Sequence, residues 1–313
     1  MSFGRFLLRR LFKYAFILFF VTTVVFVIIR LSGDPVAIMA GIDATDAARE
    51  EIRRELGLHR PIYVQYLLFL FDMLQLDFGT SITIAEGEPA GQLVLTRLPR
   101  TLALLAVALL FAFVVGTTVG MISALKQGKP ADSIGMVFTL LGQSVPSFWV
   151  GLLLIIFVAA RVDFFPISGS GSIRHLILPG LTLSFFLMAS VARLTRSNLI
   201  DVFEEEYIKT ARSKGITEQS VYFSHALRNA FIPVISFVGV QVAYLLGGAV
   251  ITEEIFAYPG MGRLLLQATV ARDFPVVQAI VFYVAFGVVF LNFLIDLSYR
   301  WLDPRISYEE RER

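Results

Sequence analysis

The chain has 313 residues, of which 56% are hydrophobic and 17% are charged, and its mean hydropathy is +0.73. This balance is that of a membrane protein and excludes an ordinary soluble domain. The absence of cysteine excludes disulfides, zinc–thiolate sites and cysteine nucleophiles, and a net charge of +2 without a basic face argues against a nucleic-acid partner.

The apolar pattern predicts an all-α, polytopic membrane protein with six transmembrane helices, because six stretches are long enough to cross the hydrocarbon core. The first, residues 14–29, is interpreted as a retained span within the N-terminal segment 1–30, since no small-residue cleavage pattern follows it. Basic residues beside the spans place both termini in the cytoplasm by the positive-inside rule. The other five spans are predicted over residues 101–125, 133–160, 176–192, 229–252 and 274–295.

The segment between the first two spans, residues 31–100, is polar and richer in acidic than in basic residues, and is predicted to be an extracytoplasmic loop region. Asp46 is positioned there to cap a short helix that ends before Gly57. A second amphipathic helix is predicted over residues 64–76. Residues 101–313 then form a core of five spans.

Glycine and proline mark two features of these spans. Gly116 and Gly120 are four residues apart, and this spacing predicts a face on which two helices approach closely. Pro146 predicts a kink within the third span. After the fifth span, residues 253–272 are predicted to form an outside loop that contains a Pro-Gly turn.

A polar and charged stretch over residues 206–233 separates the fourth and fifth spans. Ile208 and Ala211 would share the apolar face of a short helix that Gly215 ends. Thr217 is predicted to cap a second short helix before the next span. Two short amphipathic helices beside a membrane suit insertion into a groove on another protein.

This stretch contains the pattern Tyr-x-x-Thr-Ala-Arg-x-Lys-Gly, nine residues, His-x-Leu-Arg-Asn-Ala. The pattern resembles the cytoplasmic coupling loop of ABC importer membrane subunits, in the version found in dipeptide and oligopeptide permeases and their nickel and glutathione relatives. The resemblance places the coupling loop over residues 196–230. The matching residues are Tyr207, Thr210, Ala211, Arg212, Lys214, Gly215, His225, Leu227, Arg228, Asn229 and Ala230. Four further strings resemble the same family, at residues 30–36, 56–66, 76–82 and 253–264.

The resemblance implies one permease subunit of a type I ABC importer in a bacterial or archaeal cytoplasmic (inner) membrane. It implies a second homologous permease, two ABC ATPase subunits that bind ATP and magnesium, and an extracytoplasmic solute-binding protein as partners. The chain itself would need no cofactor and would not be an enzyme. Di- or oligopeptides are the implied cargo, while nickel, glutathione or another small solute stays open.

The chemistry missing from the sequence agrees with such a partnership. No GxxxxGK[ST] string occurs, so ATP has to act through a partner chain. The three histidines fall in three different loops and cannot form one metal site or triad. The centres of the spans lack Asp, Glu and His, which disfavours an ion-coupled carrier, the alternative outside the ABC class.

The polar residues within the spans are uncharged. They could line a wet translocation path, or they could bond one helix to another. A neutral path would discriminate weakly among peptides, so selectivity would be imposed elsewhere. These candidate path residues are Gln143, Ser144, Ser147, Gln241, Tyr244 and Asn292.

Overall fold

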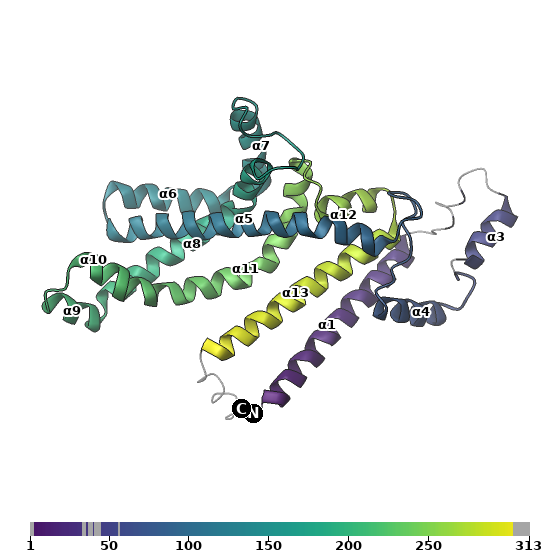
Figure 1. Cartoon of the computed structure of the whole chain (residues 1–313), viewed down its shortest axis with the longest axis horizontal. Helices are drawn as coiled ribbons and strands as arrows, with labels where there is room; N and C mark the ends of the chain where they lie inside the picture. Colours follow the sequence, from purple (N-terminus) through teal and green to yellow (C-terminus); the bar gives the residue numbers. More distant parts are fainter. Residues whose placement is uncertain (1–2, 33–35, 37–39, 41–44, 56, 303–313) are drawn as a thin grey trace. The chain divides into compact units, whose positions relative to one another are not determined.

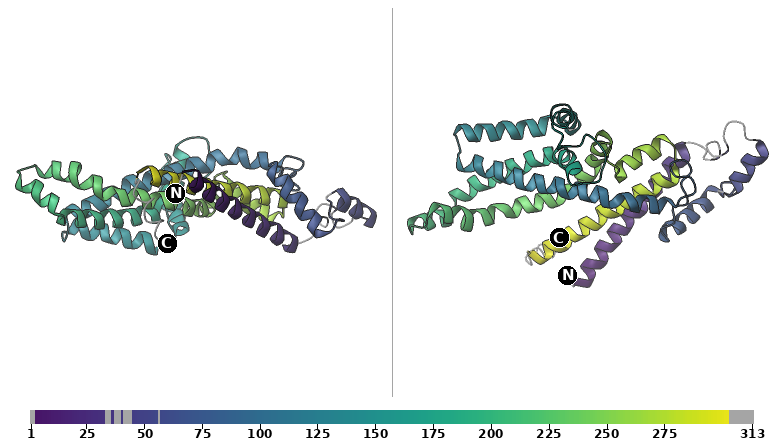
Figure 2. Two further views of the ribbon diagram at one scale, coloured as in Figure 1. Left: turned by 90° about the horizontal axis from the view of Figure 1, so that it is seen from below. Right: turned by 45° about the horizontal axis from the view of Figure 1, so that its top comes forward.

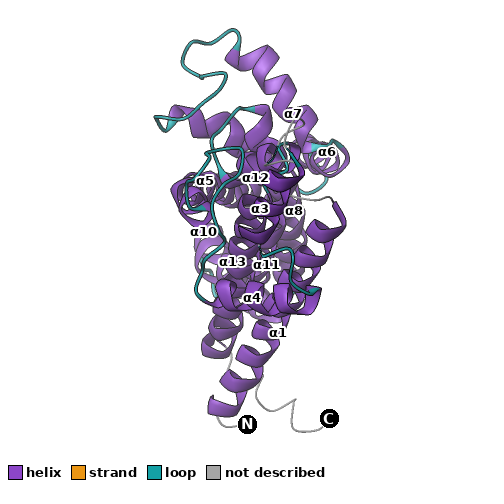
Figure 3. Ribbon diagram, turned by 90° about the vertical axis from the view of Figure 1, so that its right-hand side faces the viewer, coloured by secondary structure: helices purple, strands orange, loops and turns teal. Residues whose placement is uncertain are grey.

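The structure is a computed structural model, and it describes residues 3–32, 36, 40, 45–55 and 57–302. Figure 3 shows helices and loops but no strand over these residues. Five helices in the described ranges are long and apolar enough to cross a membrane, and a sharply bent pair adds a sixth if both halves form one span. The prediction of an all-α, polytopic membrane protein is confirmed.

The chain divides into two compact units, Met1–Pro99 with Arg263–Arg313, and Arg100–Gly262. Long apolar side chains on the spans of both units point outward. Phe16, Leu110 and Ile134 are 58%, 60% and 71% exposed. Such surfaces are stable against lipid but not against water.

In the first unit, two long helices lie side by side (Figures 1 and 2). The rings of Tyr14 and Phe293 meet edge to face between them, with centroids 6.2 Å apart. A shorter apolar helix packs on the long helix that carries Tyr14. Its contact is made by Tyr66, whose hydroxyl lies 2.6 Å from the Thr23 hydroxyl. The helices of this unit are α1 (Phe3–Ser32), α3 (Asp46–Glu55), α4 (Ile62–Leu74), the start of α5 (Ala90–Leu125), most of α12 (Met261–Val270) and α13 (Phe274–Leu302).

The short helices of this unit differ slightly from the prediction. Asp46 is the first residue of α3 rather than its cap, and the Thr45 hydroxyl accepts from the Ala48 N–H instead, at 3.3 Å. Gly57 ends this segment in the left-handed region, with φ +66°, as predicted. The second helix, α4, begins two residues earlier than predicted, directly after Pro61.

The second unit is a bundle with α8 at its centre (Figure 1). Leu178, Leu187 and Val191 of α8 are among the most deeply buried residues of its core. The helices are the rest of α5, α6 (Pro130–Ser144), α7 (Ser147–Leu154) continued by the π-helix η1 (Ile155–Ala159), α8 (Arg174–Glu204), α9 (Glu206–Ser213), α10 (Glu218–Ser220), the π-helix η2 (Val221–Ala226) and α11 (Leu227–Ile255).

The predicted close contact at Gly116 and Gly120 is confirmed, and its partner is α8. A Cβ atom on Gly116 would lie 2.8 Å from the Met188 carbonyl oxygen, and one on Gly120 would lie 2.4 Å from the Ala192 carbonyl oxygen. Only glycine permits the two backbones to approach this closely.

The third span differs most from the prediction. A single kinked helix over 133–160 was predicted, whereas α6 and α7 meet at an angle of 107°. Val145 is extended, with ψ 126°, and Pro146 precedes α7. Proline has no N–H for the helix ladder and disfavours helical geometry at the preceding residue, so the chain turns at this point.

Other helices run beyond the predicted spans, because hydrophobicity marks the bilayer while hydrogen bonding sets helix ends. The helix α5 begins at Ala90 instead of Thr101, so the end of the 31–100 segment is helical and Pro99 lies inside a helix. The helix α8 continues to Glu204, past the predicted end of the span. The stretch 253–272, predicted as a loop, contains α12.

Candidate functional site

The connector between α8 and α11, residues 205–226, is shorter than the predicted loop 196–230 because the two long helices occupy its ends. Its first helix, α9, turns an apolar side inward. Ile208 is fully buried and Ala211 is 8% exposed. Both pack with Val221 of η2 against Leu199 of α8. The apolar face expected to enter a groove on another protein is therefore already covered by this chain.

A glycine turn joins the two halves of the connector. Gly215 has φ +74° and donates to the Arg212 carbonyl at 2.9 Å. The Arg212 guanidinium spans the turn and donates to both carboxylate oxygens of Glu218, at 3.0 and 3.3 Å. Hydrogen bonds from Tyr222 and Arg212 hold the pKa of Glu218 below its ordinary value. The turn is thus fixed by backbone geometry and by one ion pair.

The second half of the connector differs from the prediction. Thr217 precedes a helix, but its side chain makes no capping hydrogen bond. The three residues of α10 pass into η2, and η2 passes into α11 without a break. The predicted second helix is therefore continuous with the fifth span, so the connector has one separate helix, α9.

The outward face of α9 is polar. Tyr207 is 40% exposed, and its hydroxyl oxygen accepts from the Asn229 amide at 2.8 Å. Thr210 and Lys214 are exposed. Of the other residues of the predicted pattern, Leu227 begins α11 and is half-buried, while His225 and Arg228 lie in η2 and α11 with side chains outside the described set.

An ion pair that the sequence analysis missed ties α6 to α8 near the connector. Arg196 donates to both oxygens of Asp132, at 2.7 and 2.9 Å. Asp132 also accepts from the Gly128 N–H at 3.0 Å, so it fastens the turn between α5 and α6. From the sequence, Arg196 had been placed only at the start of the predicted coupling loop, 196–230. An acidic residue in the first turn after Lys129 was the available signal, but its partner 64 positions away was not.

A cavity of about 320 Å³ lies at the break between α6 and α7. Four of the six predicted path residues line it: Gln143, Ser144, Ser147 and Tyr244. Gln241 lies on α11 but is not among the lining residues. Asn292 lies on α13 in the other unit, where its amide donates to the Val288 carbonyl of the same helix at 2.8 Å. Four of the six residues therefore share one space, and the translocation path itself stays a prediction.

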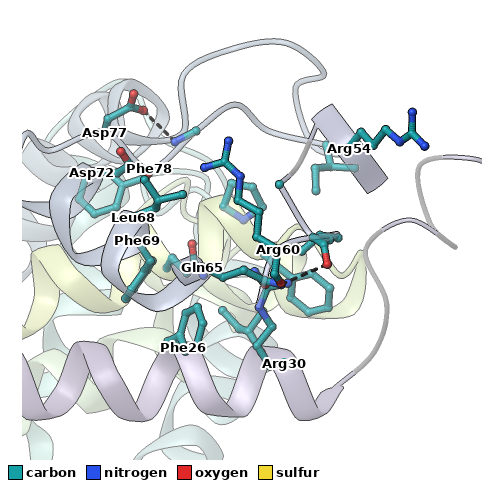
Figure 4. Close-up of a pocket in the computed structure, with 18 residues that line it drawn as sticks. Phe26, Arg30, Arg54, Arg60, Gln65, Leu68, Phe69, Asp72, Asp77 and Phe78 are labelled. Carbon is teal, nitrogen blue, oxygen red and sulfur yellow. Dashed lines mark hydrogen bonds between the residues drawn. The ribbon is translucent and has the colours of Figure 1, made fainter. Parts of the chain in front are cut away.

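A second hollow, of about 460 Å³, belongs to the first unit (Figure 4). Three of the strings singled out in the sequence meet there: Arg30 comes from the first, Arg60 and Gln65 from the second, and Phe78 from the third. The rings and guanidinium groups labelled in Figure 4 surround the space. Burial and the neighbouring Asp77 raise the pKa of the Asp72 carboxyl in its wall.

Two fully buried carboxylates serve as internal ties. Asp273 Oδ2 accepts from the Ser81 hydroxyl at 2.5 Å and from the backbone N–H groups of residues 82–84 at 3.0–3.1 Å. Glu253, predicted in a loop, lies in the last turn of α11 and accepts from the Thr101 hydroxyl at 2.7 Å. In the parts of the chain described here, no group of three His, Asp or Glu could hold a metal ion.

Two family models match the chain. The model described as "Binding-protein-dependent transport system inner membrane component" matches residues 116–308, and the corresponding N-terminal model matches residues 3–105. The oligopeptide transport system permease protein AppB of Bacillus subtilis is 39% identical and covers 97% of this chain and 99% of its own length. The di/tripeptide transport system permease protein DppB of Pseudomonas aeruginosa is 40% identical, over 93% of this chain and 95% of its own.

The chain is also similar to a glutathione permease and to a solved ABC transporter structure. The glutathione transport system permease protein GsiC of Salmonella choleraesuis is 35% identical, over 97% of this chain and 99% of its own. Among solved structures, the MetNI methionine ABC transporter in an inward-facing conformation has a chain that matches with a TM-score of 0.57 at 19% identity. The match covers 68% of this chain and 97% of that one, and it concerns the fold alone.

Proposed function

Because the chain belongs to the family of binding-protein-dependent transport system inner membrane components and has the fold of a type I ABC importer permease, we propose that it imports di- or oligopeptides. The observation that carries the cargo is the similarity over nearly the whole chain to permeases named for oligopeptides and for di- and tripeptides. The neutral polar lining of the cavity beside α6 and α7 suits such a path, because peptide groups are polar and uncharged.

The proposed assembly has three kinds of partner around this subunit. A second homologous permease completes the pore, two ABC ATPases bind ATP and magnesium, and an extracytoplasmic solute-binding protein delivers the peptide. The assembly lies in a bacterial or archaeal cytoplasmic membrane with both termini of this chain inside. The missing P-loop supports the need for separate ATPases, and the basic residues before the first span support the orientation.

The connector is the proposed docking point for one ATPase. Its polar outer face, with Tyr207, Thr210 and Lys214, is free for a protein partner, while Ile208 and Ala211 fix α9 to the bundle. A partner that pushes on α9 therefore moves α8 and α11 with it. ATP can shift the pore only as far as the ATPase binds one pore state more strongly than the other.

Co-purification with uptake tests this function. The tagged chain is extracted gently from its native membrane, and its partners are identified by mass spectrometry. In parallel, uptake of a radiolabelled dipeptide is compared between the wild-type strain and a deletion strain. We expect P-loop ATPases and a second permease with the chain, and loss of uptake on deletion. Recovery of the chain alone, with uptake unchanged by the deletion, would refute the proposal.

Glutathione is the second candidate cargo, because one relative of similar coverage carries that name. Competition for uptake distinguishes glutathione from peptides as the cargo. An excess of unlabelled glutathione should leave uptake of the labelled dipeptide unchanged if peptides are the cargo. Uptake of labelled glutathione that depends on this chain, and that an excess of unlabelled dipeptide does not reduce, would favour glutathione.

The hollow in the first unit is proposed to belong to the surface that meets the binding protein. Three family-like strings line it, and the exposed Arg60 in its wall offers an ion-pair partner. The chain has no cysteine, so one cysteine placed at Arg60 can be cross-linked without background. Cross-links to the binding protein should form there and be absent from a cysteine at Gly171. The reverse pattern would exclude this surface.

A further inference from the structure

The break between α6 and α7 leaves backbone groups without helical partners. Pro146 has no N–H, so the Gly142 carbonyl loses the bond that a continuous helix would supply. The first backbone bond within α7 runs from the Trp149 N–H to the Pro146 carbonyl, so the N–H groups of Ser147 and Phe148 have no backbone acceptor in the described ranges. Irregular backbone inside a membrane protein is stable where it is buried or lines a wet cavity. Here it lines one.

The side chains around this break are similarly unpaired. Gln143 lines the cavity, and its Nε2 atom is buried without a hydrogen-bond partner among the described residues. Ser144, Ser147 and Tyr244 also line the cavity; their hydroxyl groups have no hydrogen bond to any described residue, and those of the exposed Ser144 and Tyr244 are open to a ligand. A buried donor without an acceptor is unfavourable, so a ligand carbonyl that reaches Gln143 makes a bond that the protein itself does not supply.

The rest of the lining is apolar. Phe186 of α8 and Tyr244 of α11 form part of the wall, with ring centroids 5.6 Å apart. Leu183 and Leu245 add aliphatic surface. No Asp, Glu, Lys, Arg or His lines the cavity. Neutral donors and acceptors pair well with amide groups, whereas the charged ends of a peptide would lose water there without a counter-charge.

From this chemistry we propose that the cavity is a subsite that binds an internal, uncharged stretch of peptide through its amide groups, with the Gln143 carboxamide donating to a peptide carbonyl. This proposal rests on the peptide cargo proposed above. An extended peptide offers one N–H and one C=O at each residue whatever its side chains, so the subsite accepts different sequences. Release is straightforward, because no ion pair has to be broken.

The size of the cavity limits what it holds. Its volume of about 320 Å³ is at the small end of the range of roughly 300–1,000 Å³ for ligand sites. It has room for a short stretch rather than a whole oligopeptide. A longer cargo therefore passes the subsite segment by segment, and its termini are accommodated elsewhere.

The test is uptake by intact cells that carry a Gln143→Leu substitution in the otherwise complete importer. Labelled trialanine is compared with its analogue in which one amide is an ester, because an ester carbonyl accepts hydrogen bonds more weakly. Gln241→Leu is the matched control: it makes the same chemical change on α11, at a residue that is not among those lining the cavity. Immunoblotting and basal ATPase activity in isolated membranes show that the importer is assembled.

We expect Q143L to lower trialanine uptake at low concentration about tenfold, the effect expected for the loss of one hydrogen bond. The preference for amide over ester should disappear in Q143L and persist in Q241L. A wild-type preference that Q143L retains would overturn the proposal, as would an equal loss in both variants. Wild-type cells that take up no trialanine would refute the peptide function itself, and this subsite with it.

Discussion

The contact between α5 and α8 gives the sharpest test of the packing, through Gly120→Ala. The new Cβ atom would lie 2.4 Å from the Ala192 carbonyl oxygen and 2.7 Å from Thr195 Cβ. A backbone carbonyl cannot rotate away, so the helices must separate by at least about 0.6 Å to reach 3.0 Å, the closest approach that real Cβ atoms make. Overpacking of this kind costs about 1–3 kcal/mol, occasionally more.

Gly247→Ala is the control, because a Cβ atom there meets nothing within 4 Å. It also lies in a long helix, where alanine is favoured over glycine by up to about 1 kcal/mol. Thermal unfolding of the purified importer in detergent, followed by tryptophan fluorescence, measures both. A loss of about 1–3 kcal/mol corresponds to roughly 2–12 °C in Tm for G120A, while G247A should be unchanged or more stable. Equal stability of G120A and wild type would show that the two backbones do not touch.

Three further results are expected. Gly215 has φ +74° and open space around it, so Gly215→Asn should retain peptide uptake. Gly215→Val should reduce uptake at equal amounts of protein in the membrane, because a β-branched residue is strained there by about 1–2 kcal/mol. Equal uptake by the two variants would exclude backbone strain as the cause. Breaking the Asp132–Arg196 pair by Arg196→Leu should lower the free energy of unfolding by about 3 kcal/mol, measured by thermal unfolding. The double variant with Asp132→Asn should lose less stability than the two single variants combined. Strict additivity of the two losses would contradict the pairing. Burial raises the pKa of Asp273, but hydrogen bonds from Ile84 and its neighbours outweigh this effect and lower the pKa. The difference in stability between wild type and Asp273→Asn should therefore be full above about pH 4 and shrink as the pH falls through the lowered pKa. A difference in Tm that does not depend on pH would refute this.

Much of the fold follows from the apolar pattern. The long helices were predicted because each needs a run of apolar residues to cross a bilayer, and the Gly116 contact face was predicted because small residues permit close approach. Helix ends were not predictable from the same signal: α8 keeps its hydrogen bonds through Arg196 as far as Glu204, well beyond the apolar stretch. The 107° turn at Pro146 was located but underestimated, because proline marks a break without fixing its angle.

The candidate sites, like the fold, could be predicted only in part from the sequence. The residues at the start of the connector helix and at its glycine turn could be found from their spacing, but the sequence could not show that Ile208 faces its own bundle. The ties through Glu253 and Asp132 join positions far apart in the chain, and a single sequence carries no signal for such pairs. Glu253 was assigned to a loop because its charge ended the apolar stretch. The structure places it instead in the last turn of α11, fully buried, where its carboxylate accepts a hydrogen bond from the Thr101 hydroxyl.

One helix joins the two candidate sites of the second unit. Phe186 of α8 lines the cavity, and Leu199 of the same helix packs under the connector. Thirteen residues of α-helix span about 20 Å at 1.5 Å per residue, and the helix is continuous between them. Because buried side chains of α9 pack against α8, a displacement of α9 by a partner would be transmitted to α8 and along it to the cavity wall. The other wall is formed by the break at Pro146, which lacks ladder hydrogen bonds and yields more easily than a helix. With a continuous helix on one side and a helix break on the other, a displacement of the connector would change the shape of the cavity.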